Sequence, residues 1–469
     1  MSTTPPTVAK TTFWTHDRVA KALTPLASGN LPRGTETFGR VWTDTRTIEE
    51  GDLFVALVGE KFDAHDFVAD AVKKGAAGVV VSRAIPLGLG VPVFEVRDTL
   101  VALGALATFR RRAWNNPVVG VVGTNGKTST KELIKAALGS TLTVHATAGN
   151  LNNLIGVPMT LLAIPDGADV AVVEMGTNQP GEVGRLRAIV EPNITVVTSI
   201  AEEHLEGLGD LAGVLREEIA AAEGVPVVIV PSSQPEVAEA AKGKAKRIVS
   251  AGLDAGDVRP EKWSVEPDGR GRLSVGDVDI TVPLRGVHNL RNAMLATAVA
   301  RELGISTENA ARGIAAMPAP PMRSHVEQVG SATLINDAYN SNPGSARAAI
   351  DLLKHAGAGR QRVAVLGTML ELGPTAPALH DAVASDALAS GAEVVVGIGE
   401  FAAALRRIAP NDPRVITADD VEAAWTPLSS RLAANAVILL KGSRGMRLER
   451  LVGPISQWAG QPSVAPVRH

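Results

Sequence analysis

The sequence predicts an α/β protein of three domains, and three observations point to this fold class. The chain has 469 residues, enough for three domains at roughly 150 residues each. Short apolar β runs alternate with helical patterns along most of it, as in sheets of parallel strands. A turn at residues 115–117 and a Pro-rich linker divide the chain. We expect a small α/β domain over residues 1–115, a central parallel-sheet domain over 116–318 and a doubly wound domain over 319–469.

The composition is that of an ordinary globular chain, with 45% hydrophobic and 20% charged residues. A net charge of -3 argues against a general nucleic-acid binder. Because the sequence contains no Cys, a disulfide framework, a thiolate metal site and a Cys nucleophile are excluded. The start, MSTTPPTVAKTTFW, has no apolar signal region, and no apolar run reaches the roughly 18 residues of a membrane span. A cytoplasmic enzyme is the expected class.

The first domain reads as a small α/β unit. Its predicted elements are a strand over Asp52–Val58, a helix over His65–Lys74 and a strand over Gly78–Val81. Arg46 lies in a polar loop, where a guanidinium can bind phosphate oxygens or simply remain solvated. The basic run at 110–112 and the turn at 115–117 are typical of a helix end and a linker, which sets the first boundary.

The stretch VVGVVGTNGKTSTKELIKAAL, residues 118–138, changes from a β run to helical spacing across a Gly-rich turn. Such a loop aims backbone N–H groups and a helix N-terminus at one point, which favours phosphate. Lys127 can reach terminal phosphates and Thr128 can hold Mg²⁺. The longer form of this motif has Gly where this chain has Val121, so a plain Gly-rich turn is the alternative.

Further apolar runs over 169–175, 193–200 and 225–230 predict buried parallel strands whose carboxyl ends share an edge with this loop. Glu174 closes the first run, where a carboxylate either binds a cation such as the Mg²⁺ held by Thr128 or emerges into solvent. His204 follows the second run, and a metal or phosphate role competes there with an ordinary polar histidine.

A helix is predicted over Asp210–Glu223, capped by Asp210 and ended by Gly224. At about 100° per residue, Glu218 falls in the middle of the apolar stripe, while Glu217 points away from it. A carboxylate on a buried face needs a cation or a hydrogen-bond donor, unless the helix is turned so that Glu218 reaches water.

Two Asn-containing stretches are candidates for ligand contacts. Asn150, Asn152 and Asn153 suit a loop that hydrogen-bonds a sugar or an amide, although a bare turn would look the same. After an antiparallel flap predicted from Pro260 onward, a long Ala-rich helix starts near Asn289, which would face a nucleotide base or serve only as a helix cap.

The third domain follows the linker MPAPP at 317–321. Strands predicted at 333–335, 362–366, 393–398 and 436–440 alternate with helices near 345–355, 378–389, 401–408 and 418–433, the pattern of a Rossmann-like sheet. NDAYNSNP, with the chain's single tyrosine, Tyr339, follows the first strand, and Lys441 and Arg444 follow the last. The tail from Gln461 is expected to be disordered.

The ordered set GTNGKTS, GNLNNLIGVP, EMGTN, EEHLEG, HNLRN, NDAYNSNPGS, LGTMLELG and KGSR resembles the Mur ligase family over nearly the whole chain. TDTR and FVALVGEKFDAHDF near the N-terminus, together with DAYNSNP, resemble the member that adds D-alanyl-D-alanine. The resemblance implies that ATP phosphorylates the terminal carboxylate of a UDP-N-acetylmuramoyl tripeptide and that the amine of D-alanyl-D-alanine attacks the acyl phosphate. It also implies two Mg²⁺ ions, closure of the third domain on the second and, in our interpretation, a monomer.

The resemblance also assigns roles to residues. Lys127, Glu174, His204 and Glu218 are the expected catalytic residues, and Thr128, Glu174, His204 and Glu218 the expected Mg²⁺ ligands. ATP is expected on Gly123, Thr124, Asn125, Gly126, Lys127, Thr128, Ser129, Asn289, Arg323 and Asp337. The two substrates are expected on Thr45, Arg46, Asp63, His65, Asn150, Asn152, Asn153, Tyr339, Asn340, Asn342, Lys441 and Arg444.

Two departures from the family pattern stand out. Relatives carry a lysine, N-carboxylated by CO₂, about fourteen residues after the histidine, whereas here the ungapped count from His204 reaches Glu218. We expect Glu218 to supply the anionic oxygens that the carbamate otherwise provides. Thr368 stands where relatives often have Asp, which weakens any role for Glu371 nearby.

Two alternatives remain open at this point. A ligase of the same fold that adds a diamino acid, or glutamate to folate, would differ in its amine substrate. A nucleotide-dependent switch would hydrolyse ATP without joining anything, and the many polar loops outside the phosphate site argue against it.

Overall fold

The computed structural model describes residues 10–85, 88–266, 268–318 and 322–460. The predictions made for residues 1–9, for linker residues 319–321 and for the tail from Gln461 fall outside these ranges. The three-domain α/β fold predicted from the sequence is confirmed. Among the described residues, no helix is both long enough and apolar enough to cross a bilayer.

The N-terminal domain is built on a four-stranded parallel sheet in the order β3-β4-β5-β6. Its elements are β1 (Trp14–Thr15), α1 (His16–Leu23), β2 (Thr37–Phe38), β3 (Val41–Trp42), β4 (Leu53–Val55), α2 (Val68–Lys73), β5 (Gly78–Val81), β6 (Val93–Glu95) and α3 (Thr99–Trp114), with single 3-10 turns at η1 (Thr24–Leu26), η2 (Thr45–Thr47) and η3 (Ala64–Phe67). The predicted strand over 52–58 is shorter than expected, and the predicted helix over 65–74 begins as the turn η3, with Asp63 as its N-cap.

The central domain contains a six-stranded, fully parallel sheet in the order β12-β11-β10-β7-β9-β8. Its elements are β7 (Val118–Val122), α4 (Lys127–Gly139), β8 (Val144–Ala146), α5 (Gly156–Leu162), β9 (Val170–Glu174), α6 (Glu182–Val190), β10 (Ile194–Val197), α7 (Leu205–Leu208), α8 (Leu211–Ile219), η4 (Ala220–Ala222), β11 (Val227–Pro231), α9 (Pro235–Ala241) and β12 (Arg247–Ala251). Every residue of β7 and β9 is buried, which explains their uninterrupted apolar sequences.

The predicted helix over 210–223 forms as α8 and η4, and Asp210 caps it as expected by accepting a hydrogen bond from the amide of Gly213. The predicted burial of Glu218 is confirmed, and Val214 and Ile219 are buried with it. Two residues differ from the prediction: Leu211 is exposed, and Glu217 is buried as well. Glu217 is buried because its carboxylate accepts the amides of Gly181 and Val183 and so caps α6.

The predicted flap is an antiparallel sheet of β13 (Lys262–Val265), β14 (Arg270–Val275) and β15 (Val278–Arg285). It leads into the predicted Ala-rich helix α10 (Val287–Glu302), and α11 (Thr307–Ala315) follows. Because α10 packs against α4, its first turn comes to lie beside the Gly-rich loop.

The C-terminal domain has a sheet in the order β16-β17-β21-β18-β19-β20, parallel except for the edge strand β16. Its elements are β16 (His325–Val329), β17 (Ala332–Asp337), α12 (Pro343–Ala356), β18 (Arg362–Gly367), η5 (Gly373–Thr375), α13 (Ala376–Ala389), β19 (Val394–Ile398), α14 (Glu400–Ile408), β20 (Val415–Ala418), α15 (Val421–Ser429), β21 (Val437–Lys441), η6 (Arg444–Met446), η7 (Leu448–Leu451) and α16 (Val452–Trp458). The edge strands β16 and β20 were not predicted. The helix predicted from residue 418 begins only at Val421, because Asp420 caps it and Ala418 still belongs to β20.

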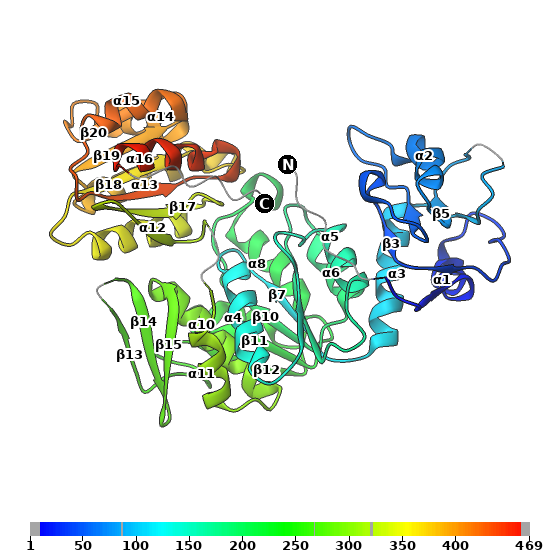
Figure 1. The fold of residues 1–469 in the computed structure, drawn as a ribbon. Helices are drawn as coiled ribbons and strands as arrows, with labels where there is room; N and C mark the ends of the chain where they lie inside the picture. Colours follow the sequence, from blue (N-terminus) through cyan, green and yellow to red (C-terminus); the bar gives the residue numbers. More distant parts are fainter. Residues whose placement is uncertain (1–9, 86–87, 267, 319–321, 461–469) are drawn as a thin grey trace.

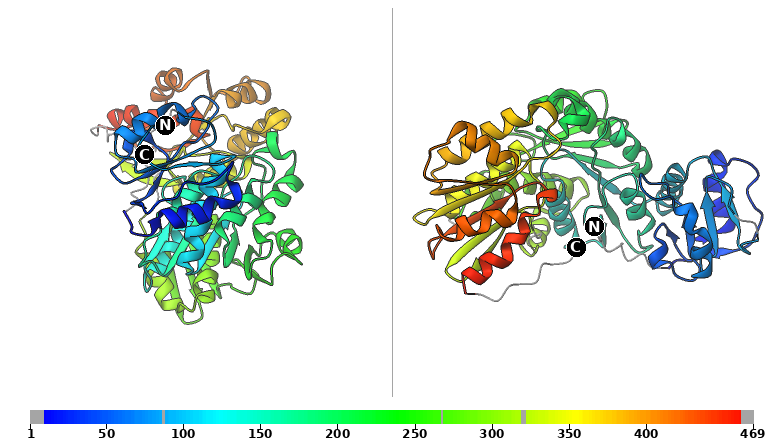
Figure 2. Two further views of the ribbon diagram at one scale, coloured as in Figure 1. Left: turned by 90° about the vertical axis from the view of Figure 1, so that its right-hand side faces the viewer. Right: turned by 90° about the horizontal axis from the view of Figure 1, so that it is seen from above.

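The three domains follow one another in space as in the sequence (Figure 1). A second direction of view shows the N-terminal sheet at one end, the central sheet in the middle and the C-terminal sheet at the other end (Figure 2). Helix α3 packs on α5 and α6, and one apolar core runs from the N-terminal sheet through α3 into the central domain.

Candidate active site

The carboxyl ends of β7, β9, β10 and β11 open into a cavity of about 1020 Å³. Loops from these strand ends form its floor, and residues of α10 and of the C-terminal domain close its other sides. Parallel sheets place ligand sites at this edge, as the sequence predicted. The volume is large enough for a nucleotide with part of a second substrate.

The Gly-rich loop between β7 and α4 is held in a shape that only glycine allows. Gly123 and Gly126 both have positive φ, 115° and 85°. A Cβ on Gly123 would lie 2.5 Å from the Thr198 hydroxyl, and one on Gly126 would lie 2.9 Å from the amide of Asn292. The loop therefore presents its backbone and the start of α4 directly to the cavity.

Hydrogen bonds to the segment that follows β10 fix the shape of this loop. The amide of Thr124 donates to the carbonyl of Ser199 at 2.7 Å, and the Ser199 hydroxyl bonds the backbone of Asn125. Thr124, Asn125, Gly126, Lys127, Thr128 and Ser129 all line the cavity, while Gly123 lies behind them. These bonds fix the shape of the loop at the edge of the cavity.

Lys127 is folded back onto its own loop. Its ammonium donates to the carbonyl of Gly123 at 2.5 Å and to that of Thr124 at 3.1 Å. Burial lowers the pKa of Lys127, but the attraction of Glu203, Glu218 and Glu174 outweighs this effect and the pKa is raised overall. Lys127 therefore stays charged in the cavity and available to an anionic ligand.

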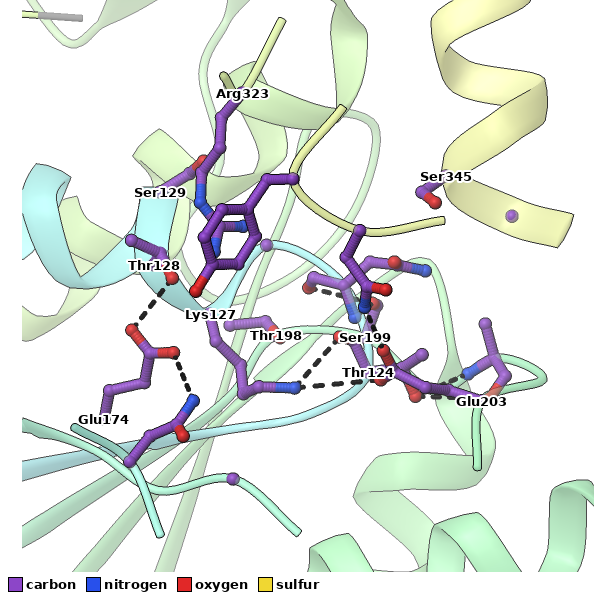
Figure 3. Close-up of a pocket in the computed structure, with 18 of the residues that line it drawn as sticks. Thr124, Lys127, Thr128, Ser129, Glu174, Thr198, Ser199, Glu203, Arg323 and Ser345 are labelled. Carbon is purple, nitrogen blue, oxygen red and sulfur yellow. Dashed lines mark hydrogen bonds and ion pairs between the residues drawn. The ribbon is translucent and has the colours of Figure 1, made fainter. Parts of the chain in front are cut away.

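Glu174 and Thr128 meet as predicted. The Thr128 hydroxyl donates to one carboxylate oxygen of Glu174 at 2.9 Å, and the side-chain amide of Asn152 donates to the other at 2.9 Å. Figure 3 shows Glu174 beside Thr128, on the side of the loop opposite to the Lys127 ammonium. A hydroxyl and a nearly inaccessible carboxylate facing a polar cavity are oxygen donors of the kind that Mg²⁺ prefers, so this pair fits a magnesium ion.

Lys131, one turn after Lys127 on α4, was not predicted from the sequence as a site residue. This lysine is 1% exposed, donates to the carbonyl of Thr147 at 2.7 Å and lies 3.8 Å from Glu174. Its position on the same helix face as Lys127 was the available signal. Lys131 is a buried positive charge shared between Glu174 and Glu132, which lies nearer at 3.1 Å.

Glu218 does not meet His204. Its carboxylate is 3% exposed and accepts the amide of Gly123 at 2.7 Å, on the far side of the loop from the cavity. Burial raises the pKa of Glu218 to about 7. Within the described residues, no three His, Asp or Glu side chains are placed to hold one metal ion, so the second predicted magnesium site is not preformed.

His204 instead faces the C-terminal domain. Its Nδ1 pairs with the carboxylate of Glu371, and the amide of Glu206 donates to the Glu371 carbonyl at 3.3 Å. The presence of Thr368 in place of Asp weakens the expectation of a role for Glu371. In the structure the Thr368 hydroxyl accepts a hydrogen bond from the amide of Glu400. Glu371 is therefore a direct partner of an expected catalytic residue.

Residues expected to contact ATP line the cavity from above. Asn289 is buried, and its amide donates to the carbonyl of Arg285 at 2.8 Å. The Arg323 guanidinium lies over the Tyr339 ring, 4.2 Å from its centroid. Asp337 pairs with Lys441 at 2.8 Å. The cavity lining includes all five.

Two asparagines of the C-terminal domain reach the central loops. The Asn342 amide donates to Asn125 at 2.8 Å and its carbonyl oxygen caps α12, while the Asn340 amide donates to Glu203 at 3.0 Å. Arg444 does not line the cavity; its guanidinium lies against Met322 and Glu449.

The loop after β8 also lines the cavity, with Asn150, Asn152 and Asn153. Asn153 accepts the amides of Ile155 and Gly156 and so shapes the turn into α5. Because β9 and β8 lie on one side of β7, and β10 and β11 on the other, this loop is on the side of the phosphate loop away from β11.

The four candidates in the N-terminal domain do not reach this cavity. Thr45 and Arg46 lie on η2, and the side chain of Arg46 is 81% exposed and pairs with Asp44 beside the same turn. His65 is buried: the amide of Ser82 donates to its Nε2 at 2.8 Å, and its Nδ1 donates to Asp63 at 2.5 Å. A hydrogen bond from the His65 amide, with further support from Arg83, holds the pKa of Asp63 down to about 2.

Comparison with known proteins identifies the family. A "UDP-N-acetylmuramoyl-tripeptide--D-alanyl-D-alanine ligase" of Bacillus subtilis (strain 168) is 34% identical, over 93% of this chain and 97% of the relative. The crystal structure of MurF from Acinetobacter baumannii superposes with a TM-score of 0.86 at 30% identity, covering 95% of this chain and 99% of that one. MurF ligase from Thermotoga maritima, solved in complex with ADP, has a TM-score of 0.80 at 25% identity, covering 90% and 98%.

The domain matches run along the chain in order. The Mur ligase family catalytic domain matches residues 38–156, the Mur ligase middle domain matches residues 121–300, and the Mur ligase glutamate ligase domain matches residues 322–444. With its phosphate loop at the carboxyl edge of a parallel sheet and these relatives, the chain belongs to the Mur ligase family.

Proposed function

We propose that this chain joins D-alanyl-D-alanine to the terminal carboxylate of a UDP-N-acetylmuramoyl tripeptide at the expense of ATP, a step of peptidoglycan precursor synthesis. The observation that carries the proposal is the loop at residues 123–129, where the Lys127 ammonium lies on the loop carbonyls and the Thr128 hydroxyl bonds the carboxylate of Glu174. The printed name of the Bacillus relative and the ADP in the Thermotoga structure support it.

The chemistry has two transfers. The carboxylate oxygen of the tripeptide attacks the γ-phosphorus of ATP, and ADP leaves with the electrons of the broken P–O bond. The amine of D-alanyl-D-alanine then adds to the acyl phosphate, loses a proton, and the tetrahedral intermediate expels inorganic phosphate to leave the amide. Phosphoryl transfer of this kind depends on positioning and charge neutralisation more than on covalent help from the protein.

Lys127 and the loop amides supply that neutralisation. To contact a γ-phosphate, the Lys127 ammonium exchanges its bonds to the carbonyls of Gly123 and Thr124 for phosphate oxygens. Thr128 and Glu174 would hold Mg²⁺, which offsets the charge of the triphosphate when bound. Asn152, which donates to Glu174, keeps that carboxylate turned toward Thr128.

The strand order separates the two substrates. We place the adenosine of ATP on the β11 side, between Asn289 on α10 and Arg323, with Asp337 near the ribose and phosphates. We place the tripeptide carboxylate on the opposite side, along the loop that carries Asn150 and Asn153. The two reacting groups then meet at the phosphate loop, and Tyr339, Asn340 and Lys441 border the space left for the amine. Asn342, predicted as a substrate contact, lies outside this lining and is buried.

The domain roles follow from this placement. We assign residues 1–115 to binding of the UDP-sugar, 116–318 to ATP and 319–469 to closure over the reacting groups. The exposed guanidinium of Arg46, paired with Asp44 in its own turn, is the group of the N-terminal domain that we assign to a diphosphate contact. Closure of the third domain would exclude water from the acyl phosphate.

A second Mg²⁺ on His204 and Glu218 remains a prediction, and it requires Glu218 to exchange the amide of Gly123 for the ion. In that case activity does not depend on bicarbonate, and Glu218→Gln raises the Mg²⁺ concentration needed for half-maximal rate. An unchanged Mg²⁺ requirement would leave Glu218 as a support of the phosphate loop only.

Mass spectrometry of the product tests the function directly. Incubation with UDP-muramoyl tripeptide, ATP and D-alanyl-D-alanine should give a product heavier than the tripeptide by D-alanyl-D-alanine minus water. Meso-diaminopimelate, lysine and glutamate, offered separately with their own acceptors, serve as competing amines. Lys127→Ala should lower the rate by about two to three orders of magnitude, the scale on which transition-state charge stabilisers act. A full rate in Lys127→Ala, or joining of glutamate instead, would reject the assignment.

A further inference from the structure

Glu203 is a buried carboxylate that the family motifs left without a role. It is 7% exposed, in the loop that follows β10, and it borders the cavity. One of its oxygens accepts the side-chain amide of Asn340 at 3.0 Å. The other lies 3.8 Å from the ammonium of Lys127.

This position is unfavourable for binding an anion unless the carboxylate is controlled. A negative charge beside the phosphate-binding lysine repels a triphosphate and attracts the same ammonium that the triphosphate needs. Of the groups that raise the pKa of Lys127 against the effect of burial, Glu203 contributes most. At 3.8 Å the two groups attract each other without forming a hydrogen bond. The Lys127 ammonium is bonded instead to the carbonyls of Gly123 and Thr124. The Glu203 oxygen that accepts Asn340 also lies 3.9 Å from Nε2 of His204.

Asn340 is the group that holds Glu203. It lies between β17 and α12 of the C-terminal domain, and Lys441 donates to its carbonyl at 2.6 Å, which ties this segment to the end of β21. The Asn340 amide therefore moves with the C-terminal domain, whereas Glu203 and Lys127 belong to the central domain. In Figure 3 the Lys127 side chain extends along the loop toward Thr124 and Glu203.

We propose that Glu203 is a positioning residue for Lys127 and that Asn340 sets its position according to whether the C-terminal domain is docked. With the domain docked, Asn340 holds the carboxylate away from Lys127, and the ammonium is free to turn to phosphate. With the domain undocked, Glu203 closes onto Lys127 and competes with the nucleotide. By thermodynamic reciprocity, bound nucleotide then favours the docked domain.

The inference rests on the proposed nucleotide site and is tested by binding rather than by turnover. The affinity for a non-hydrolysable ATP analogue with Mg²⁺ is measured by calorimetry. Asn340→Ala releases Glu203 and should weaken binding about tenfold, equal to about 1.4 kcal/mol. Glu203→Gln keeps an acceptor for Asn340 but removes the charge, and it should bind at least as tightly as the parent.

The decisive comparison is the double variant. If Asn340 acts through the charge of Glu203, then Glu203→Gln/Asn340→Ala binds the analogue as Glu203→Gln does, because the competing carboxylate is gone. Asn340 is an exposed side chain, so its loss is expected to leave the fold intact. Independent effects that simply add in the double variant would overturn the proposal.

Two further variants serve as controls, one beside Asn340 and one beside Glu203. Asn342→Ser keeps an N-cap for α12 but removes the bond to Asn125, and its effect should add to that of Glu203→Gln, since it does not act through that charge. Glu202→Gln changes the neighbouring carboxylate and should not mask Asn340→Ala. If Lys127→Ala leaves analogue binding unchanged, the nucleotide site itself is wrong; if Lys127→Ala weakens binding while Asn340→Ala does not, only the role of Asn340 and Glu203 is wrong.

Discussion

The carboxylate of Glu218 accepts the amide of Gly123 at 2.7 Å, so the first glycine of the phosphate loop is anchored on a buried acid from α8. The bond explains how a carboxylate can occupy an apolar helix face without a metal ion. It also links the protonation of a buried group to the shape of the loop, because the ionised form is the stronger acceptor.

Glu218 should make the metal-free protein less stable as the pH rises. Burial raises its pKa from 4.5 to about 7, so the folded state retains a proton that the unfolded state has lost. The stabilisation is fully present below about pH 4.5 and is lost as the pH passes 7. In EDTA, Glu218→Gln should unfold like the parent near pH 4.5 and be more stable at pH 8, by at most about 3 kcal/mol. Thermal unfolding at several pH values measures this, and a difference independent of pH would contradict it.

Lys131 should be needed for stability and for Mg²⁺ use, although it does not line the cavity. Lys131→Met leaves Glu174 buried beside Thr128 without its counter-charge, and breaking such a buried pair costs about 3 to 5 kcal/mol. We expect a loss of stability together with a higher Mg²⁺ requirement. Lys135→Met, an exposed lysine on the same helix, is the matched control and should change neither. Thermal unfolding and Mg²⁺ titration of the rate provide the comparison, and equal behaviour of the two variants would refute the role of Lys131.

The strands and the phosphate loop could be predicted from the sequence because their signals are local. Five consecutive buried residues in β7 require apolar side chains throughout, and positive φ at Gly123 and Gly126 requires glycine. The edge strands β16 and β20 escaped prediction because an edge strand with one covered face has a short, mixed sequence, as in the partly exposed residues of β16.

The contacts between side chains could not be predicted in the same way. The face that α8 buries depends on the amides of α6 that Glu217 caps, which are far away in the sequence. The pairing of His204 with Glu371 depends on how two domains are placed, and no periodicity records that. Spacing brought Lys127, Thr128 and Glu174 to one edge, but it could not show that the side chain of Arg46 is exposed whereas that of His65 is buried.

Arg46 and His65 should therefore respond differently to substitution. Arg46→Ala removes an exposed guanidinium and is expected to raise the KM for the UDP-muramoyl tripeptide about tenfold, the effect of one lost charge-assisted contact, without changing stability. His65→Leu leaves the buried amide of Ser82 without its acceptor and should cost about 1 to 3 kcal/mol of stability, while Asp63 keeps the backbone amide of residue 65 and Arg83. Steady-state kinetics measure the KM of both variants, and thermal unfolding measures their stability. A raised KM with unchanged stability in His65→Leu would show that the histidine binds substrate after all.

Glu371 should affect the rate without affecting the fold. Its side chain is 52% exposed, so its hydrogen bond with His204 contributes less than about 1 kcal/mol to stability. Glu371→Gln should unfold like the parent. It should lower kcat about tenfold, about 1.4 kcal/mol of transition-state stabilisation, because the His204 ring loses the partner that fixes Nδ1.

The KM for ATP should change little in Glu371→Gln, because Glu371 lies outside the lining of the nucleotide cavity. Glu400→Gln is the matched control: Glu400 borders the same smaller hollow of the C-terminal domain, but no bond joins its carboxylate to the central domain among the described contacts.

Since the Glu371–His204 pair crosses between domains, small-angle scattering of Glu371→Gln with bound nucleotide separates two causes of a slower rate. A parent-like shape with lowered kcat assigns the effect to the orientation of His204, whereas an expanded shape assigns it to weaker docking. Parent-like kcat would mean that the pair has no part in the reaction.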